Sequence, residues 1–176
     1  MSQMQEELRQ KAKELLEKGE VRYIIGWGKG RFHHRPPIFI YQAEDVDKLV
    51  WDEYCVANLG KYLLDDKFPE GKIGICVRGC DSRAVVRLVQ DKQVKREDVC
   101  LIGLPCTGKV DQEGRELVKC RDCMHRNPPV YDIVLGEPVE EKGNPDRFKR
   151  VEELEKLSSD EKYEYWSNVF DKCIRC

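Results

Sequence analysis

The fold is indicated most clearly between Lys72 and Cys106, by the segments Ile73-Gly-Ile-Cys-Val77, Arg78-Gly-Cys-Asp-Ser-Arg83 and Val99-Cys-Leu-Ile-Gly-Leu104. Two apolar runs of strand length flank a segment that Asp81 or Ser82 can cap as a helix extending to about Gln90. Its apolar positions, Ala84, Val85, Leu88 and Val89, share one face. The pattern predicts a βαβ unit with parallel strands and a right-handed crossover. The carboxyl ends of both strands then meet at the sheet edge where α/β proteins bind ligands.

The segments on either side extend this prediction to an α/β fold with a small, mostly parallel sheet, a cysteine knuckle, and helical N- and C-terminal segments. We expect an amphipathic helix over Ser2–Lys18, short strands at 21–25, 38–41 and 130–135, and a helix from Asp45 to about Leu64. The predicted domains are an N-terminal helix (1–20), an α/β cluster-binding domain (21–136), and a linker with a helical tail (137–176). That tail ends in a partial Cys-x-x-Cys motif.

Composition and charge exclude several classes of protein. The 176 residues carry a formal net charge of −2, and the isoelectric point near 6.0 gives no positive field for nucleic acid. No apolar run approaches the roughly 18 residues that a membrane span needs, and no secretory signal opens the chain. We therefore expect a cytoplasmic protein without a membrane span.

Nine cysteines are the unusual feature of this sequence. In a reducing compartment, such a density with two Cys-x-x-Cys pairs indicates metal or redox chemistry rather than disulfides. Cys80 follows the first strand of the βαβ unit, Cys106 follows the second, and Cys120 and Cys123 lie in a turn-rich knuckle. These four residues are the predicted ligands of an iron–sulfur cluster. The alternative is that Cys80 and Cys106 only fill space at the strand ends.

The environment of Cys80 favours the cluster interpretation at the level of sequence. The residue sits at a predicted helix N-terminus beside Arg78 and Arg83, where positive potential would lower the pKa of a thiol. Cys55, Cys76 and Cys100 lie instead within predicted elements, and we expect them to pack in the core.

The terminal pair Cys173 and Cys176 leaves a zinc alternative open. It resembles the first half of a ferredoxin motif, and it could complete a four-thiolate zinc site with Cys120 and Cys123 in a structural interaction module. A third possibility is a thiol redox protein that uses Cys120 and Cys123 without metal.

Two segments could hold a nucleotide or flavin phosphate. The first is a glycine loop with the candidate residues Gly26, Gly28, Lys29 and Gly30, for which a plain tight loop is the alternative. The second combines a strand end, a helix start and two guanidinium groups in Arg78, Gly79, Asp81, Ser82 and Arg83. No hydrolytic triad or Walker-type loop appears in the sequence, so electron transfer remains as the chemistry.

Three motifs resemble the C-terminal domain of the coenzyme F420 hydrogenase/dehydrogenase beta-subunit family: Gly103-Leu-Pro-Cys106, Cys120-Arg-Asp-Cys123 and Tyr131-Asp-Ile-Val-Leu-Gly136. The resemblance covers roughly residues 72–136 and maps Cys106, Cys120 and Cys123 onto the family's cysteines, with Cys80 as our added fourth ligand. The family usually has an Asp soon after its second knuckle cysteine, where this chain has Met124-His125-Arg126.

The resemblance implies an iron–sulfur electron-transfer subunit of an anaerobic, flavin-linked oxidoreductase complex of the hydrogenase, formate dehydrogenase or heterodisulfide-reductase type. It implies a 4Fe-4S cluster, a flavin such as FAD, other redox subunits as partners, and a flavin or deazaflavin carrier. We expect the N-terminal helix and an apolar C-terminal stripe to be partner surfaces: Tyr165, Trp166, Val169 and Phe170.

Overall fold

The computed structural model describes residues 2–64, 71–141 and 143–173. The chain divides into two compact units, Met1–Lys142 and Gly143–Cys176, which are described separately here. None of the helices within the described ranges is both long and apolar enough to cross a membrane.

A five-stranded sheet organises the first unit. Its strands are β1 (Tyr23–Trp27), β2 (Pro37–Ile40), β3 (Ile73–Val77), β4 (Val99–Gly103) and β5 (Ile133–Val134). They lie in the order β2-β1-β3-β4-β5, with β2 antiparallel to β1 and all other neighbours parallel. The structure therefore confirms the predicted α/β class and the mostly parallel sheet.

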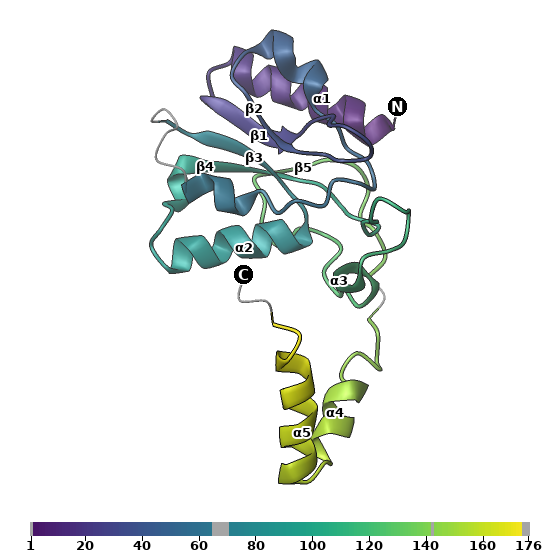
Figure 1. Cartoon of the computed structure of the whole chain (residues 1–176). Helices are drawn as coiled ribbons and strands as arrows, with labels where there is room; N and C mark the ends of the chain where they lie inside the picture. Colours follow the sequence, from purple (N-terminus) through teal and green to yellow (C-terminus); the bar gives the residue numbers. More distant parts are fainter. Residues whose placement is uncertain (1, 65–70, 142, 174–176) are drawn as a thin grey trace. The chain divides into compact units, whose positions relative to one another are not determined.

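Helix α2 (Gly79–Gln90) connects β3 to β4 and completes the predicted βαβ unit. Its N-cap is Arg78, three residues before Asp81, which is the earlier of the two predicted caps. The Asp81 carboxylate accepts a hydrogen bond from the Arg78 backbone N–H at 3.1 Å. Figure 1 shows α2 on one side of the sheet and α1 (Gln3–Glu17) on the other. Both faces of the sheet are thus covered, as parallel strands with apolar runs require.

Helix α1 is part of the core rather than a docking arm. Ser2 caps it as predicted, since its hydroxyl accepts a hydrogen bond from the Gln5 N–H. The apolar side chains of Leu8, Ala12 and Leu15 are all buried within the first unit. The apolar face that we expected to meet a partner is instead buried in the core of the first unit.

The prediction of a helix from Asp45 to Leu64 is also wrong. Two short 3-10 turns, η1 (Ala43–Lys48) and η2 (Gly60–Leu64), stand at its ends with an irregular segment between them. In that segment the carbonyl oxygen of Ala57 accepts hydrogen bonds from the Trp27 indole and from the Arg78 guanidinium. Side chains from distant parts of the sequence thus donate to this carbonyl group, which an α-helix would pair with one of its own backbone N–H groups.

The remaining elements are short. A third 3-10 turn, η3, spans Arg96–Asp98, and α3 covers Val118–Arg121. The second unit is a pair of helices, α4 (Lys149–Glu155) and α5 (Ser159–Phe170), and α5 opens with a capping box between Ser158 and Glu161. Neither helix of the second unit buries a residue.

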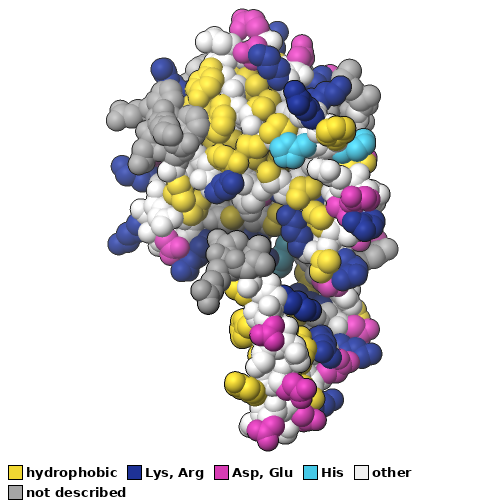
Figure 2. Space-filling view, in the orientation of Figure 1, with side chains coloured by type: hydrophobic (Ala, Val, Ile, Leu, Met, Phe, Trp, Pro, Cys, Tyr) yellow, Lys and Arg dark blue, Asp and Glu magenta, His cyan; other side chains and the backbone are white. Residues whose placement is uncertain are grey.

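The second unit instead exposes large apolar side chains, which Figure 2 shows interspersed with charged ones. Tyr163 is 78% exposed and Phe170 is 67% exposed, while the Trp166 and Phe170 rings stack with centroids 6.1 Å apart. Helices of 7 and 12 residues are marginal in water without a packed face. Trp166 and Phe170 belong to the stripe for which we expect a partner, and that expectation stays a prediction.

Candidate functional site

The carboxyl edge of the sheet brings the first two predicted cysteine ligands together. Strand β3 ends at Val77 and is followed by Cys80, and β4 ends at Gly103 and is followed by Cys106. The two thiols are close enough for their charges to interact. Cys80 is exposed and Cys106 is half-buried.

The cysteine knuckle is hydrogen-bonded to the Cys106 loop. The Cys123 N–H donates to the Cys120 carbonyl at 3.1 Å, and the Cys123 thiol donates to the His125 carbonyl at 3.5 Å. The Cys106 N–H donates to the Arg126 carbonyl at 2.9 Å, and the Arg126 Nη2 donates to the Cys120 carbonyl at 3.0 Å. Arg126 therefore connects the segment of Cys106 to the segment of Cys120 and Cys123.

The start of α2 packs directly against the same knuckle. A Cβ atom added to Gly79 would lie 2.1 Å from the His125 carbonyl oxygen and 2.9 Å from that of Asn127. Further along the helix, the Ser82 hydroxyl accepts a hydrogen bond from the Val130 N–H at 3.2 Å. The backbone segments that carry all four predicted ligands are thus in mutual contact, and Gly79 is required because any side chain would separate two of them.

A four-thiolate cluster needs four free thiols that converge on one point. All four cysteines are free thiols, and the buried Arg126 Nη1 has no hydrogen-bond acceptor among the described residues. No three Cys, His, Asp or Glu side chains in those residues are arranged to hold a metal ion. The converging segments and the unused donor fit such a site, but the thiols would have to turn toward one another to share a metal.

The expected activation of Cys80 is wrong. Although Cys80 is an exposed residue, neighbouring atoms partly desolvate its thiol and raise the pKa of Cys80, and the adjacent Asp81 carboxylate raises this pKa more than the Arg78 guanidinium lowers it. The sequence placed two arginines beside the thiol, but Arg78 turns inward and is neutralised by Asp81. Ligation would therefore have to displace a proton that the metal-free site retains.

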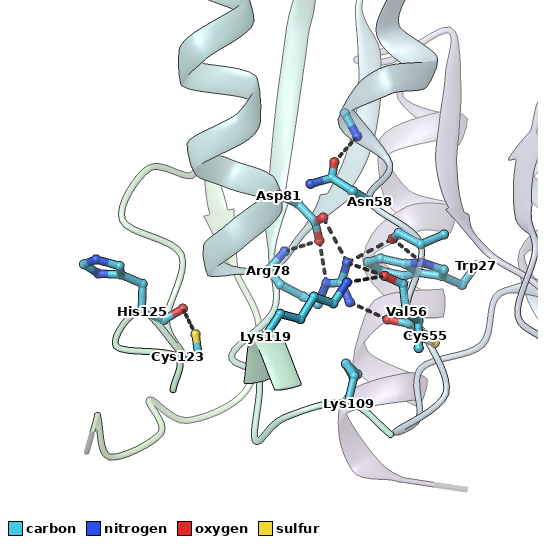
Figure 3. A network of polar contacts seen from close by, with 12 residues as sticks. Trp27, Cys55, Val56, Asn58, Arg78, Asp81, Lys109, Lys119, Cys123 and His125 are labelled. Atoms are coloured by element: carbon cyan, nitrogen blue, oxygen red, sulfur yellow. Dashed lines mark hydrogen bonds and ion pairs between the residues drawn. The ribbon is translucent and has the colours of Figure 1, made fainter. Parts of the chain in front are cut away.

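Arg78 lies at the centre of the buried polar network in Figure 3. Its guanidinium forms an ion pair with Asp81 and donates to the carbonyl oxygens of Cys55, Val56 and Ala57. It also lies over the Trp27 ring, 5.0 Å from the centroid. Burial would lower the pKa of Arg78, but the hydrogen bonds and charge of Asp81 outweigh it and raise that pKa. Arg78 thus fastens the Cys55–Ala57 segment to the junction of β3 and α2.

The other predicted phosphate ligands have structural roles in the same way. Gly79, Asp81 and Ser82 are buried, which leaves Arg83 as the exposed member of that set. In the glycine loop, Gly26 belongs to β1, the Gly28 N–H donates to Pro36, and the Gly30 N–H donates to His34. Lys29 is exposed beside this turn. The described contacts correspond to the plain hairpin loop that was the alternative interpretation.

Sequence reasoning missed Lys109, which is 3% exposed. Its ammonium donates to the Asp52 carbonyl at 2.7 Å and lies 3.6 Å from the centroid of the Trp51 ring. Burial lowers its pKa. Lys109 lines a pocket of about 480 Å³ together with Pro105 and Thr107 of the Cys106 loop. The one available signal was the position of Lys109 three residues after a predicted ligand.

The remaining cysteines divide into two groups. Cys55, Cys76 and Cys100 are buried in the core, so their predicted packing role is confirmed. Cys173 is exposed at the end of the second unit, and Cys176 lies outside the described residues.

Comparison with known proteins gives one relevant curated relative. No family model matches the chain. The chain is 29% identical over 109 residues to the F420-dependent formate dehydrogenase 1 subunit beta of Methanococcus maripaludis, a match that covers 61% of this chain and 28% of that subunit. The chain therefore spans well under half of this relative's length.

A solved structure shares the fold. A chain of the F420-reducing NiFe hydrogenase complex from Methanosarcina barkeri matches with a TM-score of 0.52 and 21% identity, over 61% of this chain and 39% of that chain. At this identity the structural match supports the fold alone. The sequence match supports the resemblance to the F420 hydrogenase/dehydrogenase beta-subunit family: the chain is similar to the beta subunit of an F420-dependent formate dehydrogenase.

Proposed function

We propose that this chain is an electron-transfer subunit of a flavin-linked oxidoreductase complex, and that Cys80, Cys106, Cys120 and Cys123 hold a 4Fe-4S cluster in it. The observation that carries the proposal is the hydrogen bonding of the cysteine knuckle to the loop after β4, through Cys106, Arg126 and Cys120. Four thiolates from separated segments are the usual ligand set of such a cluster.

When bound, the cluster supplies one-electron transfer. The residues of the chain hold and surround it. Cys120 is buried while Cys106 and Cys123 are half-buried, so protein covers three of the four thiols and Cys80 faces solvent. The backbone bonds of the knuckle fix the spacing of the ligand-bearing segments. Arg78 has a structural role at this edge, since its guanidinium donates to Asp81 and to three backbone carbonyl groups.

The complex that we propose is of the hydrogenase, formate dehydrogenase or heterodisulfide-reductase type. The sequence relative is a formate dehydrogenase subunit, and the structural neighbour comes from a hydrogenase complex. Partner redox subunits would bind the exposed aromatic side chains of α5, of which Tyr163 and Phe170 are the most exposed.

For a flavin, we propose the pocket beside the Cys106 loop in place of the glycine loop. The pocket contains a buried cation, Lys109, and lies at the sheet edge that carries the cysteines. A flavin phosphate would supply the anion that a buried ammonium favours. The Lys109→Met variant should then lose flavin while it keeps its iron content.

The test of the cluster is a series of Cys→Ser variants, each reconstituted anaerobically with ferrous iron and sulfide. We expect the four predicted ligands to lose most of their iron, whereas Cys173→Ser, a matched exposed thiol in the second unit, keeps it. Loss of bound zinc at Cys120, Cys123 and Cys173, with no iron in any variant, would support the zinc alternative and contradict the proposal.

A further inference from the structure

Arg126 occupies an unusual position in the cysteine knuckle. It is the third residue after Cys123, and its side chain is 16% exposed. Its backbone carbonyl accepts the Cys106 N–H at 2.9 Å, and its Nη2 donates to the Cys120 carbonyl at 3.0 Å. One residue therefore contacts the backbones of two predicted ligands that are 14 positions apart in sequence.

The guanidinium is held from the other side by the loop that follows Cys106. Its Nη2 lies 3.4 Å from the Glu116 carboxylate, which fixes the plane of the group. A Cβ atom added to Gly108 would lie 2.8 Å from the Arg126 Nη1 and 2.9 Å from the Glu116 carboxylate. Gly108 also has a φ of +118°, a backbone conformation that glycine adopts far more readily than other residues. The loop thus depends on glycine to approach the arginine.

The Arg126 Nη1 is buried and has no acceptor among the described residues. A buried guanidinium donor without an acceptor is costly. In native proteins such a group is explained by strain, by a redox or catalytic role, or by a water or ion that occupies the site. The cysteine site is the neighbouring feature that would bring new acceptors, because sulfur atoms of a bound cluster accept hydrogen bonds from nearby N–H groups.

We propose that Arg126 is the positioning residue of the cysteine site: it holds the Cys106 loop against the Cys120–Cys123 knuckle, and its free Nη1 hydrogen bonds to sulfur when the cluster is bound. The inference rests on the proposed function and adds to it a residue outside the predicted ligand set. Hydrogen bonds and positive charge near sulfur stabilise the reduced cluster. Loss of Arg126 should therefore make the reduction potential more negative.

The experiment compares Arg126→Met, Arg126→Lys and the control Arg121→Met in the full chain. Arg121 is an exposed arginine of the same knuckle, so its replacement removes the same charge without touching the bonds described. Iron and sulfide per chain are measured after anaerobic reconstitution, and the potential by redox titration of the visible absorbance. Protection of the Cys106 amide in metal-free protein is measured by hydrogen exchange.

We expect Arg126→Met to hold less than half of the wild-type iron, to have a more negative potential and to expose the Cys106 amide to faster exchange. Arg126→Lys should recover part of the iron content, and Arg121→Met should match wild type. The proposal is overturned if Arg126→Met keeps wild-type iron and potential, or if both Met variants lose iron equally.

Two further readouts keep the inference separate from the proposed function. If the wild-type chain binds no iron, the proposed function fails, and Cys106 amide exchange alone decides whether Arg126 positions that loop. If Arg126→Met unfolds, Glu116→Gln removes the ion pair while keeping the Arg126 bond to Cys120. A partial loss of iron in Glu116→Gln, at an unchanged unfolding midpoint, would support the proposal, and unchanged iron would overturn it.

Discussion

Arg78 and Asp81 form an ion pair in which the exposed fractions of the two side chains are 2% and 0%. The pair joins the end of β3 to the first turn of α2, next to Cys80 in the sequence. Because Arg78 also donates to three carbonyl groups of the Cys55–Ala57 segment, removal of Asp81 leaves a buried cation with neutral acceptors only.

Asp81→Asn should lower the free energy of unfolding by about 3–5 kcal/mol, the usual cost of leaving one charge of a buried pair uncompensated. The double variant Arg78→Met/Asp81→Asn should cost less than the sum of the two single changes. Urea unfolding followed by circular dichroism measures all three. Additive effects would show that the two side chains are not energetically coupled.

Gly79→Ala should destabilise the fold and deplete the cysteine site of iron. The new methyl group would lie 2.1 Å from the His125 carbonyl, so helix or knuckle must shift. Gly114→Ala is the matched control, because its Cβ meets nothing within 4 Å although its φ is +80°. We expect a loss of at least about 2 kcal/mol for Gly79→Ala against about 1 kcal/mol for the control. Equal losses of stability and equal iron contents would contradict the close packing of α2 on the knuckle.

The packing role of Cys55 predicts a specific dependence of stability on pH. Burial raises the pKa of this thiol from 9.0 to about 12, so the unfolded chain releases its proton before the folded chain does. The stabilising contribution is complete below pH 9 and is lost as the pH rises from 9 toward 12. Relative to Cys55→Ala, the wild-type free energy of unfolding should fall by up to about 1.4 kcal/mol per pH unit in that window. A difference that does not vary with pH would mean that the thiol is hydrated.

The exposed stripe on α5 predicts a separation of stability from assembly. Trp166 and Phe170 are 46% and 67% exposed, so their replacement by alanine should change the free energy of unfolding by less than about 0.5 kcal/mol. The same double variant should no longer co-purify with redox subunits from its native host. Intact co-purification, checked by quantitative mass spectrometry, would assign the partner surface to other residues.

The sequence was a good guide wherever local apolar pattern and tertiary packing agree. The runs 73–77 and 99–104 became β3 and β4, and the capped segment between them became α2. The cysteines expected in the core, Cys55, Cys76 and Cys100, are buried. These predictions depend on continuous apolar runs and on helical spacing of apolar residues, both of which can be read from neighbouring residues.

Long-range partners explain the failures. Apolar spacing over 45–64 is consistent with a helix, but donors from Trp27 and Arg78, distant in sequence, capture its carbonyl groups. Arg78 itself looks like a phosphate ligand on the functional edge until Asp81 and the burial of its side chain are known. The hydrogen bonds of Arg126 to the segments of Cys106 and Cys120 likewise have no local signal, because they form only when the chain has folded.

The most direct test of the account is to purify the full chain without oxygen and to measure iron, zinc and acid-labile sulfide per chain, with a visible spectrum before and after dithionite. If the chain holds a 4Fe-4S cluster, it should contain about four iron and four sulfide per chain and show brown absorbance that bleaches on reduction. A colourless protein that contains zinc and no sulfide would contradict the account and would leave a structural zinc module.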